Sequence, residues 1–295
     1  MLPGVGPKFT KPLNSVEDLD RLNWSVDVRK ELSYVYEAIT LTRHRLEGKV
    51  PLIGFSGAPW TLMSYMIEGA GSATQSKAKR WLYVQPDASH RLLSLLADTV
   101  TSHLVYQAVA GAQLLQIFES HAGVLTSSLF SKFSLPYLVQ IMHAVRNRLI
   151  EDHGFRPDQL PPLIVFAKDA HYALQELIDS GYDVVSLDWT ICPTHARTLA
   201  GNKVTLQGNL DPCALYAPNS ELHDLVVDML QKFQPHRYIV NLGHGIYPDV
   251  DPEKVKTLVD LVHSLPAASP DSDSDKAPSP IPCEVHDLPC ISVAN

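Results

Sequence analysis

The sequence predicts an α/β fold in which helices wrap a parallel sheet. Six short apolar runs, each typical of a strand buried on both faces, alternate with segments of helical periodicity. Five of the six runs end with a polar or charged residue within a position or two of the last apolar one. Such chemistry at the carboxyl ends of parallel strands favours a (β/α)8 TIM barrel over an open sheet, with about six of the eight β/α units present.

The clearest unit lies in residues 50–71, VPLIGFSGAPWTLMSYMIEGAG. An apolar strand over 50–55 meets the breakers Gly57 and Pro59, and a helix over 60–67 follows at once. Strand, tight polar turn and helix form the repeating unit of parallel α/β folds, and ligands in such folds bind beside the turn. We therefore expect a ligand site at the carboxyl end of this strand.

Five further apolar runs complete the predicted sheet. They cover residues 114–118, 163–166, 183–187, 203–207 and 238–242. Helices are expected between them, where apolar residues recur every three or four positions. These helices cover residues 32–48, 76–83, 86–111, 136–151, a short stretch after 169, 220–233 and 252–262. Ser220 is expected to be the N-cap of its helix, and Asp251 with Pro252 to open the last one.

Composition limits the classes of function. The chain has 295 residues, of which 45% are hydrophobic and 19% charged, as in an ordinary soluble domain. No apolar run is long enough to span a bilayer, and the formal net charge of −8 argues against nucleic-acid binding. The usage of the four cysteines fits a reducing compartment, so we expect a cytosolic protein. Any anionic substrate then needs cations that are gathered locally.

The composition changes at about residue 266. Residues 266–295 contain six prolines, alternating aspartate and serine, and few apolar residues. Such a segment cannot bury enough apolar surface to offset the entropy lost on ordering, so it is predicted to be disordered. The predicted organisation is a barrel over residues 1–265, incomplete at its N-terminus, followed by a Pro/Ser/Asp-rich tail.

Five longer segments give the chain a specific resemblance. They read AITLTRHRLEGKVPLIGFSGAPWTLMSYMIEG, LLQIFESHAG, VVSLDWT, VTLQGNLDPCALYA and YIVNLGHGIYPDVDPE. On these segments the chain closely resembles the uroporphyrinogen decarboxylases of haem biosynthesis, over roughly residues 2–264. The resemblance implies a (β/α)8 barrel, a homodimer and no metal or organic cofactor. It also implies removal of CO2 from the four acetate side chains of uroporphyrinogen, which gives coproporphyrinogen.

The chain departs from this family near its N-terminus. Family members begin with a strand and loop reading R-Q-A-G-R-Y, whose arginines hold substrate carboxylates. A second strand ends in F-S-D, whose aspartate contacts the pyrrole NH groups. Neither motif occurs in residues 1–295. We therefore expect an N-terminally truncated family member that retains no catalytic residue and is impaired or inactive as a decarboxylase.

Substrate contacts are expected at five positions, two of them from the resemblance and three from their place at the strand ends. Tyr65 matches a family tyrosine that hydrogen-bonds a substrate carboxylate, although composition alone favours packing on a helix. Ser120 matches a substrate-binding serine, and the alternative is a turn or a helix cap. His244 lies between two glycines that leave room for a ligand, and it is expected to contact a carboxylate or the ring. Phe55 and Gly57 line the mouth of the first strand, where Phe55 packs against either the tetrapyrrole or the core.

Other chemically active residues have simpler interpretations. Lys168 and Asp169 are interpreted as a salt bridge that closes a loop, with a functional pair as the alternative. Cys192 and His195 lack the His-x-Cys spacing of the zinc site in related methyltransferases, and a structural zinc normally takes four ligands. No metal site is therefore expected. No role is assigned to His121 or Asp188.

Two alternative functions stay open. The chain is either a non-catalytic subunit that pairs with a full-length enzyme or, with less support, a zinc-dependent methyltransferase of the same superfamily. Under the leading hypothesis the partners are uroporphyrinogen and a second subunit, which is an identical copy or a full-length chain. Neither a nucleic acid nor a membrane is expected as a partner.

Overall fold

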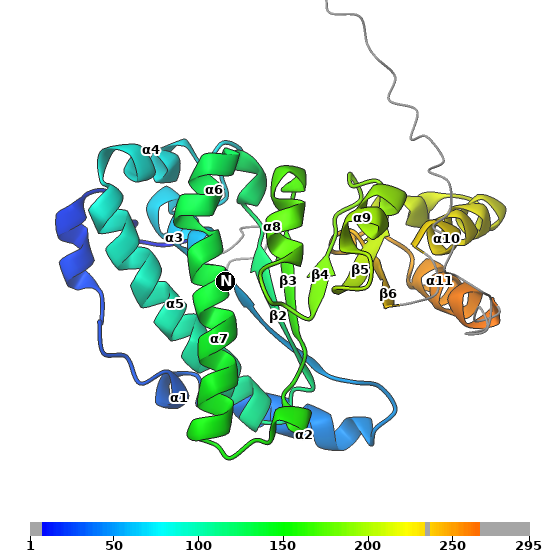
Figure 1. Ribbon diagram of the computed structural model, residues 1–295, viewed down its shortest axis with the longest axis horizontal. Coiled ribbons are helices and arrows are strands. Elements are labelled where there is room, and N and C mark those ends of the chain that lie inside the picture. The colour runs from blue at the N-terminus through cyan, green and yellow to red at the C-terminus, as the bar shows by residue number, and fades with distance from the viewer. Residues whose placement is uncertain (1–7, 234–236, 266–295) are drawn as a thin grey trace, which may run out of the picture.

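A parallel six-stranded sheet forms the centre of the fold (Figure 1). The computed structural model describes residues 8–233 and 237–265. The strands pair in chain order, and every neighbouring pair is parallel. They are β1 (Ile53–Gly57), β2 (Leu114–Glu119), β3 (Leu163–Ala167), β4 (Val184–Ser186), β5 (Thr205–Leu210) and β6 (Tyr238–Leu242). The predicted parallel sheet of six strands is confirmed, and the tail predicted for 266–295 lies outside the described residues.

Helices cover the outer face of the sheet, where α5 and α7 lie side by side (Figure 1). The longer ones are α2 (Ser33–Leu46), α3 (Pro59–Glu68), α4 (Ser76–Val84), α5 (Pro86–Val109), α7 (Leu135–Glu151), α10 (Asn219–Phe233) and α11 (Pro252–Ser264). The shorter ones are α1 (Val28–Glu31), α6 (Ser127–Phe133), α8 (Leu174–Ile178) and α9 (Pro193–Ala200). None of the helices in the described ranges is long and apolar enough to cross a membrane.

The main core lies between the sheet and these helices. Successive side chains of a strand point to opposite faces, and in β2 Leu115 and Ile117 point to the helices and are fully buried. The expected apolar stripe of α5 covers them from outside, and all of its members are buried. The stripe consists of Leu92, Leu96, Val100 and Leu104. The apolar periodicity of the sequence thus identified the buried face of this helix.

The structure corrects one expected helix boundary and adds helices that were not expected, among them α6 and α9. Ser220 is not the N-cap of its helix, because α10 already begins at Asn219 and its hydrogen bonding reaches back to Pro218 O at 2.9 Å. The helix α6 was not expected, since it is only seven residues long and its sequence has little periodicity. The predicted opening of α11 is confirmed, because the side chain of Asp251 accepts a first-turn N–H at 3.0 Å.

The sheet is open between β1 and β6, which are its two ends and do not pair with each other. Six strands in this arrangement are six of the eight β/α units of a (β/α)8 barrel, as the sequence predicted. The inner face of β1 is correspondingly accessible, and the side chain of Phe55 is 63% exposed.

One side chain of α5 covers part of the outer edge of β1. Leu52 O accepts the N–H of Gln113 at 2.8 Å, so the backbone polar groups of Leu52 point toward β2. These groups alternate in direction along a strand, and those of Phe55, three residues later, therefore point away from β2. The amide of Gln107 pairs with both groups. Phe55 N donates to Oε1 at 2.9 Å, and Nε2 donates to Phe55 O at 2.8 Å. Gln107 therefore takes the place of a neighbouring strand at this position.

Gln107→Met is predicted to lower the free energy of unfolding by about 2–4 kcal/mol, because it removes two hydrogen bonds of a buried amide while keeping the side-chain length. Urea-induced unfolding measures the change. Gln113→Met is the matched control, since it removes a single bond, from Leu52 N at 3.1 Å, at an exposed position. We expect the control to cost less than about 1 kcal/mol. Equal losses in the two variants would contradict the role of Gln107 at the edge.

Candidate functional site

An aromatic row crosses the inner face of the sheet near the carboxyl ends of the strands. The ring of Phe118 in β2 packs edge-to-face on Phe55 of β1 and Phe166 of β3, with ring centroids 6.0 and 5.9 Å apart. The row continues to His244, whose ring centroid is 6.4 Å from that of Phe166 and 6.0 Å from that of Trp189. Aromatic pairs in this geometry stabilise one another and present an apolar surface. These five residues are called the aromatic row below.

One layer closer to the amino ends of the strands, the inner face is polar. Gln207 of β5 donates through Nε2 to Ser186 Oγ of β4 at 3.0 Å and to Gln116 Oε1 of β2 at 3.4 Å. All three side chains are buried. Buried polar groups are costly unless they are paired, so this network fixes the spacing of β2, β4 and β5 beneath the row.

The end of β2 meets α3 beside the row. The ring centroids of His121 and Tyr65 are 4.8 Å apart, and His121 Nδ1 shares a 2.9 Å hydrogen bond with Ser64 Oγ. The carbonyl of His121 accepts the indole N–H of Trp60 at 3.0 Å. Burial lowers the pKa of His121 below its ordinary value, so its ring is neutral at pH 7. Ser120 is half-buried next to it.

Lys168 follows β3 and lies at the rim of the row. Its ammonium is 5.5 Å from the ring centroid of Trp189 and forms an ion pair with Asp169. Asp169 has a left-handed backbone with φ of 56°, and its N–H donates to the buried carboxylate of Asp188 at 2.7 Å. A Cβ on Gly123 would collide with Asp169 Cβ, so the loops after β2 and β3 are in direct contact. The ion pair interpreted from the sequence is confirmed.

Hydrogen bonds of Asp188 hold the loop after β4 in place. Its carboxylate is fully buried and accepts the N–H of Asp169 at 2.7 Å and that of Thr190 at 2.9 Å. Nδ2 of Asn209 in β5 donates to the carbonyls of Asp188 and Ile191, at 2.8 and 2.7 Å. The loop is thereby tied to β3 and β5. Asp188 positions Trp189 at the row.

A close backbone contact places His244. Gly243 N donates to the carbonyl that ends β5 at 2.7 Å. A Cβ on Gly243 would collide with Trp189 N and lie 2.9 Å from the carbonyl carbon of Asp188. A Cβ on Gly245 would meet nothing within 4 Å. The two glycines therefore differ: Gly243 is needed for backbone packing, and only Gly245 leaves the open space that the sequence analysis expected of both.

Four of the five expected substrate contacts gather at this end of the sheet. Phe55 and His244 belong to the aromatic row, and Tyr65 and Ser120 lie beside it. Gly57 also ends β1 there but faces α3 rather than the row, since an added Cβ would lie 3.1 Å from a side-chain carbon of Leu62. Contact of any of these residues with a substrate stays a prediction.

Sequence reasoning missed three members of the aromatic row. Phe118, Phe166 and Trp189 were not singled out, although alternation along the strands could have placed Phe118 and Phe166 on one face. His121 was given no role, because no local pattern shows that its ring meets Tyr65. Within residues 8–233 and 237–265, no three His, Cys, Asp or Glu side chains converge as a metal site would require.

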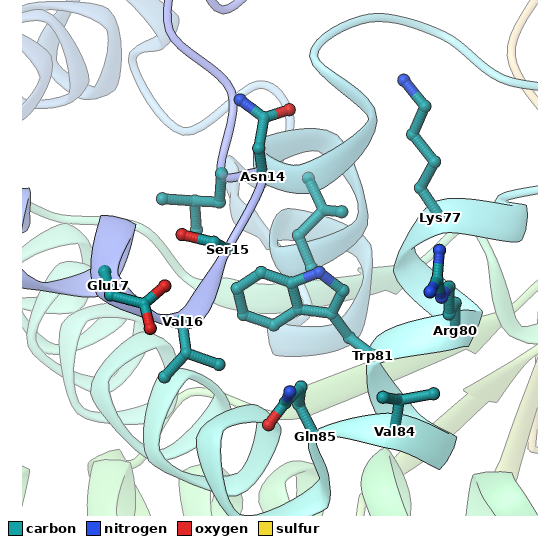
Figure 2. A pocket seen from close by; sticks show the side chains of 11 residues that line it. Asn14, Ser15, Val16, Glu17, Lys77, Arg80, Trp81, Val84 and Gln85 are labelled. Carbon is teal, nitrogen blue, oxygen red and sulfur yellow. The ribbon is translucent and has the colours of Figure 1, made fainter.

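A separate cavity of about 440 Å3 lies between residues 13–17 and α4 (Figure 2). The indole of Trp81 lies at its centre, with Lys77 and Arg80 on the α4 side and Glu17 opposite. None of the residues of the aromatic row lines this cavity. It is therefore distinct from the candidate site.

Glu119 is a fully buried carboxyl group behind the rim. Its Oε1 accepts the hydroxyl of Thr61 in α3 at 2.5 Å, and its Oε2 accepts the hydroxyl of Ser134, just before α7, at 2.7 Å. Burial raises the pKa of Glu119 to about 7, against the effect of these two hydrogen bonds. The group connects β2 to α3, the helix that carries Tyr65.

Glu119→Gln is predicted to remove a pH dependence of stability. Between its ordinary pKa of 4.5 and about 7, the folded protein holds a proton on Glu119 that the unfolded chain has lost. The corresponding stabilisation is complete below pH 4.5 and is lost as the pH rises through 7, by on the order of 3 kcal/mol. Urea unfolding of wild type and variant at pH 5 and pH 7.5 measures it. Parallel pH profiles would show that Glu119 is not the titrating group.

Gly243→Ala is predicted to lower the free energy of unfolding by about 2–3 kcal/mol, because the added methyl group meets backbone atoms that cannot rotate away. Gly245→Ala is the control on the other side of His244, with an expected change below about 0.5 kcal/mol. Thermal and urea unfolding give both values. Comparable stability of the two variants would be the contradicting outcome.

The sequence of the chain matches a known protein family over most of its length. The uroporphyrinogen decarboxylase (URO-D) family model matches residues 1–265. The human uroporphyrinogen decarboxylase is 59% identical over 263 residues, which are 89% of this chain and 71% of the human protein. The uroporphyrinogen decarboxylase of Salinibacter ruber is 51% identical over 263 residues, covering 89% of this chain and 72% of that protein.

Solved structures share the fold at low identity. A methyltransferase from Methanosarcina mazei superposes with a TM-score of 0.70 at 19% identity, covering 86% of this chain and 69% of that one. A B12-independent methionine synthase from Shewanella gives a TM-score of 0.52 at 15% identity, covering 77% of this chain and 64% of that one. These likenesses concern the barrel architecture alone, whereas the family is established by the match over residues 1–265. The chain belongs to the uroporphyrinogen decarboxylase family.

Proposed function

We propose that residues 1–295 bind uroporphyrinogen on the aromatic row, as the substrate-holding part of a decarboxylase site. The observation that carries the proposal is the row itself, in which Phe55 and His244 are exposed and Phe118 and Trp189 half-buried at the carboxyl ends of the strands, with polar groups beside them. A tetrapyrrole has the matching chemistry, because its macrocycle is apolar and its carboxylates project outward. The names of the relatives support this choice of ligand.

The family reaction removes CO2 from acetate side chains, and the electron pair left behind needs a sink. A pyrrole ring serves as its own sink once it is protonated, so a protein has only to hold the carboxylates, favour a positive ring and exclude water. The described residues contribute to the first and third tasks. Phe55, which is exposed, and Phe118, which is half-buried, exclude water from one face of the ligand, while the hydroxyl groups of Tyr65 and Ser120 donate hydrogen bonds to carboxylates.

The second task finds no matching group within the aromatic row itself. No R-Q-A-G-R-Y or F-S-D motif occurs in residues 1–295, and the side chains of the row are three phenyl rings, an indole and an imidazole. Without a ring-facing carboxylate the cationic intermediate loses its main electrostatic stabilisation. We therefore infer that this chain by itself binds the substrate but decarboxylates it poorly or not at all.

Oligomeric state and location belong to the same proposal. We infer a dimer, formed by two copies or with a full-length subunit, in the cytosol. Among the described residues, β1 and β6 have no strand partner on their outer sides, and Gln107 covers the edge of β1 only at Phe55. This supports association, because an open strand edge readily pairs with another chain. A non-catalytic subunit of this kind is the second candidate function. Sedimentation of the purified chain, alone and mixed with the human enzyme, distinguishes the two forms.

The test of function is anaerobic incubation of the purified chain with uroporphyrinogen, with products followed by chromatography and binding by equilibrium dialysis. The human enzyme is the positive control. We expect saturable binding with no products that have seven to four carboxylates. Efficient formation of those products would overturn the proposed impairment, and a folded chain without measurable binding would overturn the proposed ligand.

A further inference from the structure

We propose that Lys168 forms a carboxylate-binding subsite of the tetrapyrrole site, in addition to the five contacts that the sequence analysis expects. The subsite rests on the proposed function, since its ligand is a carboxylate of the macrocycle on the aromatic row. The contact is a charge-assisted hydrogen bond from the ammonium group, which is stronger than a bond between neutral groups.

The backbone that carries Lys168 is fixed from several sides. Lys168 N donates to Glu119 O at the end of β2, at 3.2 Å. The next residue, Asp169, is held by the buried carboxylate of Asp188 at 2.7 Å and packs against Gly123. Because the loop is already ordered, a ligand that binds to its side chain has only the side chain left to immobilise.

The ammonium group lies among the polar rim residues. It is 5.5 Å from the ring centroid of Trp189 in the aromatic row. Burial and, to a smaller extent, the charge of Lys168 lower the pKa of His121, whose ring centroid is 4.8 Å from that of Tyr65. Trp189 and Tyr65 carry no charge, and the ring of His121 is neutral, so Lys168 brings the positive charge to this group. A carboxylate at this part of the rim therefore finds its countercharge at Lys168.

The ion pair with Asp169 leaves the ammonium accessible. An ammonium group has three donor protons, and a monodentate contact with Asp169 uses one of them. The side chain of Lys168 is 25% exposed and that of Asp169 44% exposed, so water reaches the pair and its net stabilisation is small. A ligand carboxylate can share the ammonium or displace Asp169. The carboxylate of Asp169 is thus a weak internal competitor.

Four variants test the subsite. Lys168→Met removes the charge and keeps the aliphatic stem, whereas Lys168→Arg keeps a cation. Asp169→Asn removes the competing carboxylate, and asparagine tolerates the left-handed backbone found there. Lys77→Met is the matched control, because this exposed lysine belongs to the cavity of Figure 2 rather than to the rim. The measurement is anaerobic equilibrium dialysis of the full chain against uroporphyrinogen, with circular dichroism and thermal unfolding to verify each fold.

We expect Lys168→Met to weaken binding about tenfold, Lys168→Arg by less than about threefold, and Lys77→Met not at all. Asp169→Asn is expected to tighten binding by about threefold, which a merely structural ion pair would not do. Unchanged binding in folded Lys168→Met overturns the subsite and leaves the proposed function intact. Equal weakening by Lys77→Met also overturns it, because attraction is then unspecific or located at the other cavity. A wild-type chain that binds no uroporphyrinogen overturns the proposed function and the subsite with it.

Discussion

The parallel register of the sheet is the constraint on which the rest of the structure depends. All strands run in the same direction in chain order, so their carboxyl ends meet at one edge. Register pairs Phe118 with Phe166, and alternation sends both rings to the inner face while Ile117 and Val165 face the helices. A slip of one residue would exchange these faces. The aromatic row and the main core therefore follow from one pairing.

Buried polar contacts fix the loops that follow the strands at this edge of the sheet. The carboxylate of Asp188 fixes the loop after β3, the amide of Asn209 fixes the loop after β4, and the absence of a side chain at Gly243 lets the loop after β6 close on the loop after β4. Each contact joins a loop to another loop or to a neighbouring strand. The positions of Trp189 and His244 thus depend on backbone packing behind them more than on their own side-chain contacts.

Local patterns predicted the strands and most helices, because apolar runs and proline signals depend only on neighbouring residues. Long-range contacts escaped prediction. Gln107 pairs with Phe55 from 52 positions away, and no pattern within α5 distinguishes it from another helical glutamine. Lys168 was interpreted as half of an ion pair, which it is, but its neighbours Trp189 and His121 come from other loops. The family resemblance supplied candidate contacts that periodicity alone would have assigned to packing.

Charge and apolar area have separate tasks in this site. A chain with a net charge of −8 repels a ligand with eight carboxylates at long range, although salt screens that repulsion beyond about 10 Å at 0.1 M. The aromatic row contributes apolar area whatever the charge, whereas the cation at Lys168 acts at contact distance and selects an orientation. Holding a substrate and stabilising a cationic ring are therefore independent properties. Holding the substrate needs apolar area and a countercharge, whereas stabilising the cationic ring needs a carboxylate beside it. A protein with the first arrangement alone binds the ground state without lowering the barrier.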